Sequence, residues 1–130
     1  MKRISLLFMT IAFVFMGCSN DDDQTKEQES QQLDQMYQEI IALSLVTTEA
    51  CTNSEEWSFT AIGSKSCGGP TGYIAYSLKI DTVAFLKKVE DYTKAQNEFN
   101  IKWGIPSTCE MAIPPTDVDC VDGKPTLVYN

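Results

Sequence analysis

The chain has 130 residues and a formal net charge of −8, with 18 acidic side chains, 10 basic side chains and no histidine. The acidic balance argues against nucleic-acid binding, which requires a basic surface. The lack of histidine excludes Ser-His-Asp and Cys-His nucleophile pairs and removes the commonest metal ligand. A chain of this length favours one domain with a modest core.

The first 17 residues have the pattern of a bacterial export signal. Lys2 and Arg3 supply positive charge, and residues 4–16 form an apolar segment. A bilayer span needs roughly 20 apolar residues, whereas a signal peptide needs roughly 7–15. An uncleaved membrane anchor is the alternative, and it is disfavoured because the acidic residues 21–23 prevent a longer apolar span.

Gly17 and Cys18 follow this segment and resemble the lipobox of bacterial lipoproteins, although Phe15 and Met16 depart from its commoner aliphatic-then-small pattern. The resemblance implies cleavage before Cys18 by a type II signal peptidase. It also implies that Cys18 carries a diacylglyceryl thioether and an acylated amine, with chains such as palmitate. Several buried chains, each worth ~0.8 kcal/mol per CH₂, hold a protein firmly to a membrane.

Residues 18–30 are rich in Asp, Gln and Glu and contain no large apolar side chain. We predict a lipidated N-terminus and a flexible acidic tether over this range. Residues 19–23 also resemble the acidic tract that marks Bacteroidota lipoproteins for display on the cell surface; a merely solvated linker is the alternative. The predicted location is the bacterial outer membrane, facing either the periplasm or the exterior.

Residues 31–130 are predicted to form one small globular domain. A helix over about 31–46 is indicated by side chains at helical spacing, namely Leu33, Met36, Tyr37, Ile40, Ile41 and Ser44. A strand over 57–62, closed by Gly63, and a second strand over 73–77 flank the glycine-rich turn 68–72.

The pattern predicts a long helix over 82–103, with Asp81 as N-cap and Gly104 as C-cap. Its predicted buried stripe is Val83, Leu86, Val89, Tyr92, Phe99 and Trp103. Residues 118–121 and 126–129 form a hairpin around Asp122 and Gly123. Because one hairpin alone is marginal, all strands should share a sheet. The predicted fold is α+β, with two helices on a small antiparallel sheet of three to four strands, stabilised by disulfides.

Four cysteines remain besides Cys18, namely Cys51, Cys67, Cys109 and Cys120. In an exported protein an even number indicates disulfides. Three pairings are possible, and we prefer Cys51–Cys67 with Cys109–Cys120 because their loops are shortest. A four-cysteine zinc site is disfavoured, since no two cysteines have the spacing C-x₂₋₄-C.

Several short motifs suggest ligand sites and fail on inspection. Residues 63–70 lack the order of a phosphate-binding loop, because Lys65 precedes the glycines. Asp117, Asp119 and Asp122 approach a calcium loop but break the EF-hand spacing, which leaves only a weak irregular site. We expect no cofactor and no metal.

Asp81, Thr82 and Val83 resemble the Asp-Ser/Thr-aliphatic site at which Bacteroidota O-glycosylate exported proteins. The resemblance implies modification of the Thr82 hydroxyl. The alternative is that Asp81 serves only as the helix cap.

Residues 63–77, 107–109 and 120–125 are similar to segments of small Bacteroidota lipoproteins, over roughly Cys51 to Tyr129. No activity is established for those proteins, so no catalytic residue carries over.

We therefore expect a lipid-anchored, non-enzymatic binding or structural module whose partner is a protein or glycan. Aromatic side chains should lie mostly in the core, and two or three exposed together would form a stacking surface. One alternative is an inhibitor of a secreted hydrolase, either a protease or a lysozyme, acting through a loop at 68–72 or 107–115. An enzyme is the third possibility.

Overall fold

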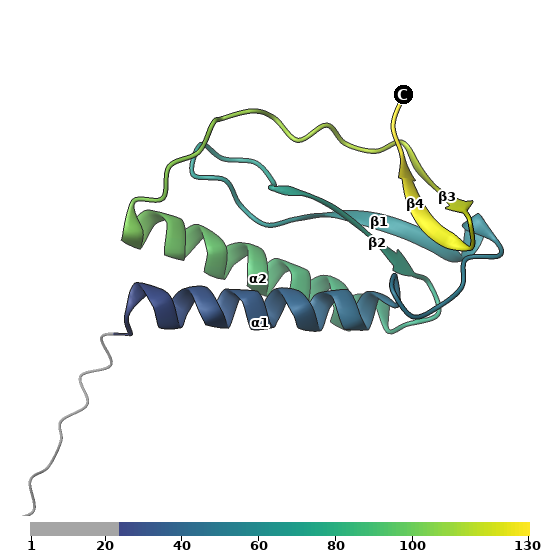
Figure 1. Ribbon diagram of the computed structural model, residues 1–130, viewed down its shortest axis with the longest axis horizontal. Helices are drawn as coiled ribbons and strands as arrows, with labels where there is room; N and C mark the ends of the chain where they lie inside the picture. Colours follow the sequence, from purple (N-terminus) through teal and green to yellow (C-terminus); the bar gives the residue numbers. More distant parts are fainter. Residues whose placement is uncertain (1–23) are drawn as a thin grey trace, which may run out of the picture.

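The structure is a computed structural model that describes residues 24–130. Its elements, drawn in Figure 1, are α1 (Lys26–Ser44), the short 3-10 helix η1 (Ser54–Glu56), β1 (Trp57–Ile62), β2 (Gly72–Ser77), α2 (Thr82–Trp103), β3 (Asp117–Val121) and β4 (Lys124–Val128). The predicted signal peptide lies outside the described residues. Within residues 24–130, no helix combines the length and hydropathy that crossing a membrane requires.

Helix α1 begins at Lys26 rather than near residue 31. The side chain of Thr25 accepts a hydrogen bond from the backbone of Gln28 at 3.3 Å, and the Gln28 side chain accepts one from the backbone of Thr25 at 3.0 Å. This reciprocal capping box stabilises the first turn. Residues 26–30 therefore belong to the helix and not to a tether. Hydrophobic periodicity missed them because they carry no apolar side chain.

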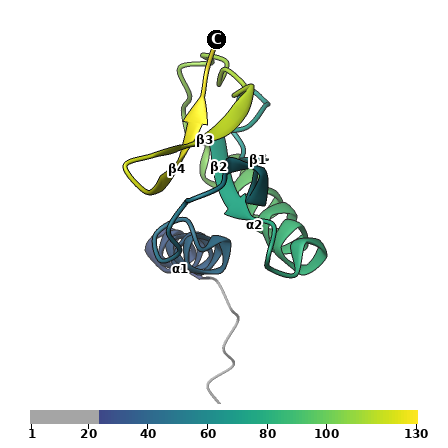
Figure 2. The same cartoon turned by 90° about the vertical axis from the view of Figure 1, so that its right-hand side faces the viewer.

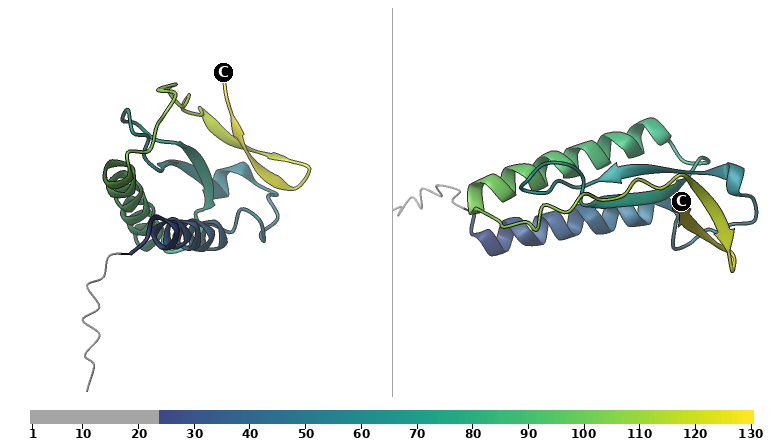
Figure 3. Two further views of the ribbon diagram at one scale, coloured as in Figure 1. Left: turned by 60° about the vertical axis from the view of Figure 1, so that its left-hand side comes forward. Right: turned by 90° about the horizontal axis from the view of Figure 1, so that it is seen from above.

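The molecule has three layers (Figure 2). Helices α1 and α2 lie side by side and run in opposite directions on one face of the antiparallel pair β1–β2, and the hairpin β3–β4 lies on the other side (Figure 3). The larger core lies between the helices and the strand pair. It contains Ile40, Ile62, Ile74, Tyr76, Phe85, Val89 and Tyr92.

A second core lies between β1–β2 and the hairpin β3–β4. It contains Cys51, Trp57, Ala75 and Val118, with Phe59, Cys120 and Leu127 packed against it. The strands form two separate two-stranded sheets, so the predicted single sheet is wrong although the α+β class is confirmed. The hairpin packs on the face of β1–β2, and this packing buries Val118, which is 2% exposed.

The bounds of α2 agree with the prediction. Asp81 Oδ1 accepts a hydrogen bond from the backbone of Ala84 at 3.0 Å, and Gly104 ends the helix with φ of 58°. The predicted stripe is wrong at its first two members, since Val83 is 80% exposed and Leu86 is 38% exposed, while Phe85 is buried. Phe85 takes the buried position because it is larger than Val83 and lies four residues before Val89, on the same face of the helix.

Two disulfides join Cys51 to Cys120 and Cys67 to Cys109, with Cα–Cα distances of 5.3 and 5.4 Å. Both distances are typical of disulfides. The preferred pairing of neighbours in sequence is therefore wrong. Loop length was the only criterion available from the sequence, whereas the layers bring distant segments together.

Candidate functional site

Cys18, the predicted lipidation site, lies outside the described residues, and its modification stays a prediction. Helix α1 begins at Lys26, so only seven residues separate it from Cys18. An extended chain covers at most about 3.6 Å per residue, which gives a maximum span of about 29 Å. A lipid on Cys18 would therefore hold the folded part close to the membrane surface.

Thr82 is the first residue of α2, and its side chain is half-buried. The preceding Asp81 carboxylate caps the helix, while the following Val83 is exposed. These contacts explain Asp81 without a modification. Glycosylation of Thr82 stays a prediction.

Polar side chains of α2 hold the segment that joins β1 to β2. The backbone N–H of Gly63 donates to Thr93 Oγ1 at 3.0 Å, and that of Ser64 donates to Gln96 Oε1 at 2.7 Å. Asn100 Nδ2 donates to the carbonyl of Ser64 at 2.8 Å. These hydrogen bonds fix the first two residues of the segment, Gly63 and Ser64, to α2.

The glycine-rich turn itself is closed by its own backbone. Lys65 N–H donates to the carbonyl of Gly69 at 3.0 Å, and Gly68 N–H donates to the carbonyl of Lys65 at 2.9 Å. The Lys65 ammonium donates to the carbonyl of Glu110. The amides of Lys65 and Gly68 are therefore used to close the turn itself.

The aspartates of the C-terminal hairpin contact their own neighbours in the chain. Asp117 and Asp119 each accept a hydrogen bond at 2.8 Å from the backbone of the next residue, and Asp122 occupies the turn with φ of 51°. In the described part of the chain, no group of three or more His, Cys, Asp or Glu is placed to hold a metal ion. The three aspartates therefore gain no support as a calcium site.

Residues 105–116, here called the clamped loop, join α2 to β3 along the side of the molecule opposite α1 (Figure 1). Its first half is held by the disulfide Cys67–Cys109, by a hydrogen bond from Ser66 Oγ to the carbonyl of Ile105, and by the bond from Lys65 Nζ to the carbonyl of Glu110. All three contacts come from the turn between β1 and β2. They fix residues 105–110 of the loop to that turn.

The other end of the clamped loop is also fixed. Pro115 is buried, and Thr116 donates to the carbonyl of Val128 from its backbone at 2.8 Å and from its hydroxyl at 3.2 Å. Between these two anchors lie residues 111–114, whose backbone makes no hydrogen bond within residues 24–130. The Met111 side chain is 91% exposed and that of Ile113 is 71% exposed.

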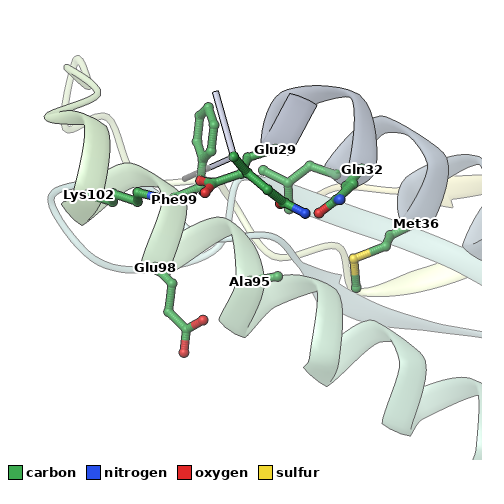
Figure 4. Close-up of a pocket in the computed structure, with 9 residues that line it drawn as sticks. Glu29, Gln32, Met36, Ala95, Glu98, Phe99 and Lys102 are labelled. Carbon is green, nitrogen blue, oxygen red and sulfur yellow. Dashed lines mark hydrogen bonds and ion pairs between the residues drawn. The ribbon is translucent and has the colours of Figure 1, made fainter. Parts of the chain in front are cut away.

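A cavity of about 240 Å³ lies between the first turns of α1 and the last turns of α2 (Figure 4). Glu29 and Lys102 point toward each other across its rim and form an ion pair, while Glu98 points away. Trp103 Nε1 donates to Glu29 Oε2 at 2.7 Å. The Lys102 ammonium, and next the Trp103 indole, hold the pKa of Glu29 below its ordinary value. An ionised, paired carboxylate is suited to joining helices and not to proton transfer.

A second, mostly apolar hollow of about 280 Å³ lies at the opposite end of the helix pair. It is lined by Ala42, Leu43, Leu45, Ile80, Ala84 and Phe85, with Asp81 and Lys88 beside them. Asp81 is engaged as a helix cap, and Lys88 pairs with Glu39 at 2.7 Å. No free polar group converges there to orient a ligand.

Comparison with known protein families, curated proteins and solved structures finds no match to this chain.

The structure confirms disulfide bonding at all four predicted cysteines and brings Cys67 together with Cys109. Of the aromatic side chains that could form a stacking surface, Trp57 and Tyr76 are buried and Tyr129 is exposed. The sequence did indicate a loop at 107–115 but not Met111 within it. The sequence signal that could have found it is a large apolar residue, Met111, in the short segment between Cys109 and the paired prolines 114–115.

Proposed function

We propose that this chain is a non-enzymatic binding module, held at the bacterial outer membrane by lipid on Cys18. The observation that carries the binding role is the clamped loop, which presents exposed apolar side chains on a backbone fixed at both ends. Such preorganisation lowers the entropic cost of binding a partner. The lipobox-like residues Gly17 and Cys18 support the anchor.

The proposal of a non-enzymatic role rests on how the carboxylates are used. Lys102 forms an ion pair with Glu29. Lys79 Nζ lies 2.8 Å from Glu49 Oε1 and 2.7 Å from Glu56 Oε2. A general acid or base needs a pKa matched to the working pH, whereas Lys102 beside Glu29 and Lys79 beside Glu49 hold the pKa of these two carboxyls below its ordinary value.

The anchor is tested by expressing the full chain in a bacterial host. We expect the unmodified chain to sediment with membranes and to incorporate labelled palmitate, and Cys18→Ala to lose both properties. Ser19→Ala is the matched control and should behave as the unmodified chain does. Palmitate labelling of Cys18→Ala would refute lipidation at this residue.

A second candidate, inhibition of a secreted protease or lysozyme, is favoured by one specific observation. In residues 111–114, Met111, Ile113 and Pro114 are exposed, and this segment lacks internal backbone hydrogen bonds and lies between two fixed points. The alternative loop at 68–72 presents no large apolar side chain. Of the two candidate loops, the clamped loop is therefore the better inhibitory element.

This candidate is tested with the full chain in detergent against a panel of secreted proteases and lysozymes. We expect inhibition of at least one enzyme and its loss when residues 111–114 are replaced by Gly-Ser-Gly-Ser. Ile101→Ser, at a helical side chain that is 75% exposed, is the control. If no enzyme of the panel is inhibited, the inhibitory role is wrong, while the anchored binding role is judged separately by the Cys18 variants.

A further inference from the structure

We propose that the clamped loop binds the substrate cleft of a serine endopeptidase and that Met111 fills an apolar S1 pocket, the pocket that receives the side chain before the scissile bond. This inference rests on the second candidate function above. It adds the class of target enzyme and the residue that selects it.

From Met111 to Pro114, the backbone of the clamped loop offers the unpaired groups that such a cleft binds, while the residues before it are held by the clamp, Cys109 with φ of 60° and Glu110 through its carbonyl. Serine endopeptidases read a substrate in part through its main chain, and an extended segment binds by main-chain hydrogen bonds only if its own groups are unpaired. Within the described residues, no protein group pairs with the main chain of Met111, Ala112 or Ile113. Ile113 and Pro114 each precede a proline, which favours extended backbone at both.

Among the exposed side chains, Met111 is the one that fits the pocket. It is 91% exposed, unbranched and followed by the small residue Ala112. Ile113 is branched at Cβ and is followed by Pro114, which lacks the N–H of an ordinary leaving amide. A deep apolar pocket accepts a long flexible side chain such as methionine, whereas a pocket with an acidic base selects lysine or arginine.

The anchors explain why the bound loop would resist cleavage. Cys109 is tied to Cys67 two residues before Met111, and Pro115 is buried four residues after it. If the bond after Met111 were cut, both new ends would stay in place, so the cleaved amine would remain beside the acyl group. Religation then competes with hydrolysis, since the ends keep a high effective concentration.

The test uses the full chain in detergent and measures inhibition constants against chymotrypsin, pancreatic elastase, subtilisin and trypsin. We expect the unmodified chain to inhibit at least one of the first three, which have apolar S1 pockets, and not trypsin. Met111→Gly should weaken that inhibition about 10- to 150-fold, because one buried methionine side chain is lost. Met111→Lys should lose it similarly and gain inhibition of trypsin.

Val83→Lys is the matched control, because Val83 is 80% exposed on α2 and lies outside the clamped loop. It should leave all four constants unchanged. Failure of the unmodified chain to inhibit any of the first three enzymes overturns the assignment of the target class. Inhibition that is insensitive to both Met111 variants overturns the role of Met111 but leaves an inhibitory function standing. Rapid cleavage between Met111 and Ala112 with loss of inhibition also overturns the proposal, because the loop is then a substrate.

Discussion

At Gly63 the backbone leaves β1 with φ of 79°, in the left-handed region that favours glycine. A Cβ atom there would lie 2.1 Å from Thr71 Oγ1 and 2.6 Å from Gln96 Oε1. The position therefore has both a backbone requirement and a steric one. It also starts the segment that anchors the clamped loop.

Gly63→Ala should destabilise the protein by about 2–4 kcal/mol, because left-handed strain adds to steric overlap. The measurement is urea denaturation of the oxidised chain. Gly68→Ala is the matched control, since Gly68 has φ of 91° but open space around it. The Gly68→Ala variant should lower the free energy of unfolding by about 1–2 kcal/mol, from backbone strain alone. Equal losses for the two variants would contradict the steric argument.

At the scale of elements, α1 and α2 are joined by two kinds of contact. Apolar side chains such as Ile40 and Phe85 meet in the larger core. Near the start of α1, Glu29 forms an ion pair with Lys102 and accepts a hydrogen bond from Trp103, and both partners lie at the end of α2. The lowered pKa of Glu29 makes this second contact sensitive to acid.

Glu29→Gln should lower the melting temperature at pH 7 by more than it does at pH 3. The folded state lowers the pKa of Glu29 from 4.5, so its stabilisation is present above that value and is lost as pH falls through the folded pKa. Thermal unfolding followed by circular dichroism at each pH gives the difference. Glu98→Gln, at the same cavity but pointing away from the pair, should show no such trend. A Glu29→Gln difference that is constant from pH 7 to pH 3 would refute the linkage.

At the scale of the whole molecule, each disulfide joins segments that are distant in sequence. Cys51–Cys120 ties the segment before β1 to β3, and Cys67–Cys109 ties the turn between β1 and β2 to the clamped loop. Cys51 is 3% exposed and part of the second core. The first bond therefore secures a layer, while the second fixes a loop.

Non-reducing digestion with mass spectrometry should recover peptides joining Cys51 to Cys120 and Cys67 to Cys109. Removing either bond by a pair of serine substitutions should cost about 4 kcal/mol from chain entropy. The Cys51→Ser, Cys120→Ser variant should lose more, since it also places a hydroxyl in the second core. A peptide joining Cys51 to Cys67 would show that the observed pairing is wrong.

Local chemistry made the elements predictable. Asp81 and Gly104 bound α2 as expected because caps act within one turn, and Asp122 with Gly123 forms the expected hairpin turn. The exposed loop near 107–115 was also anticipated. Met111 was not, because exposure depends on which segments cover a residue.

The sequence by itself determined the α+β class and the bounds of α2 and β1, and the export signal that ends at Cys18 stays a prediction from it. These depend on propensities, caps and periodicity over a few residues. Only the tertiary structure decided the cysteine pairing, the division into two sheets, and the burial of Phe85 in place of Val83. Those features depend on how layers stack, since burial and disulfide distance are set by segments far apart in the chain.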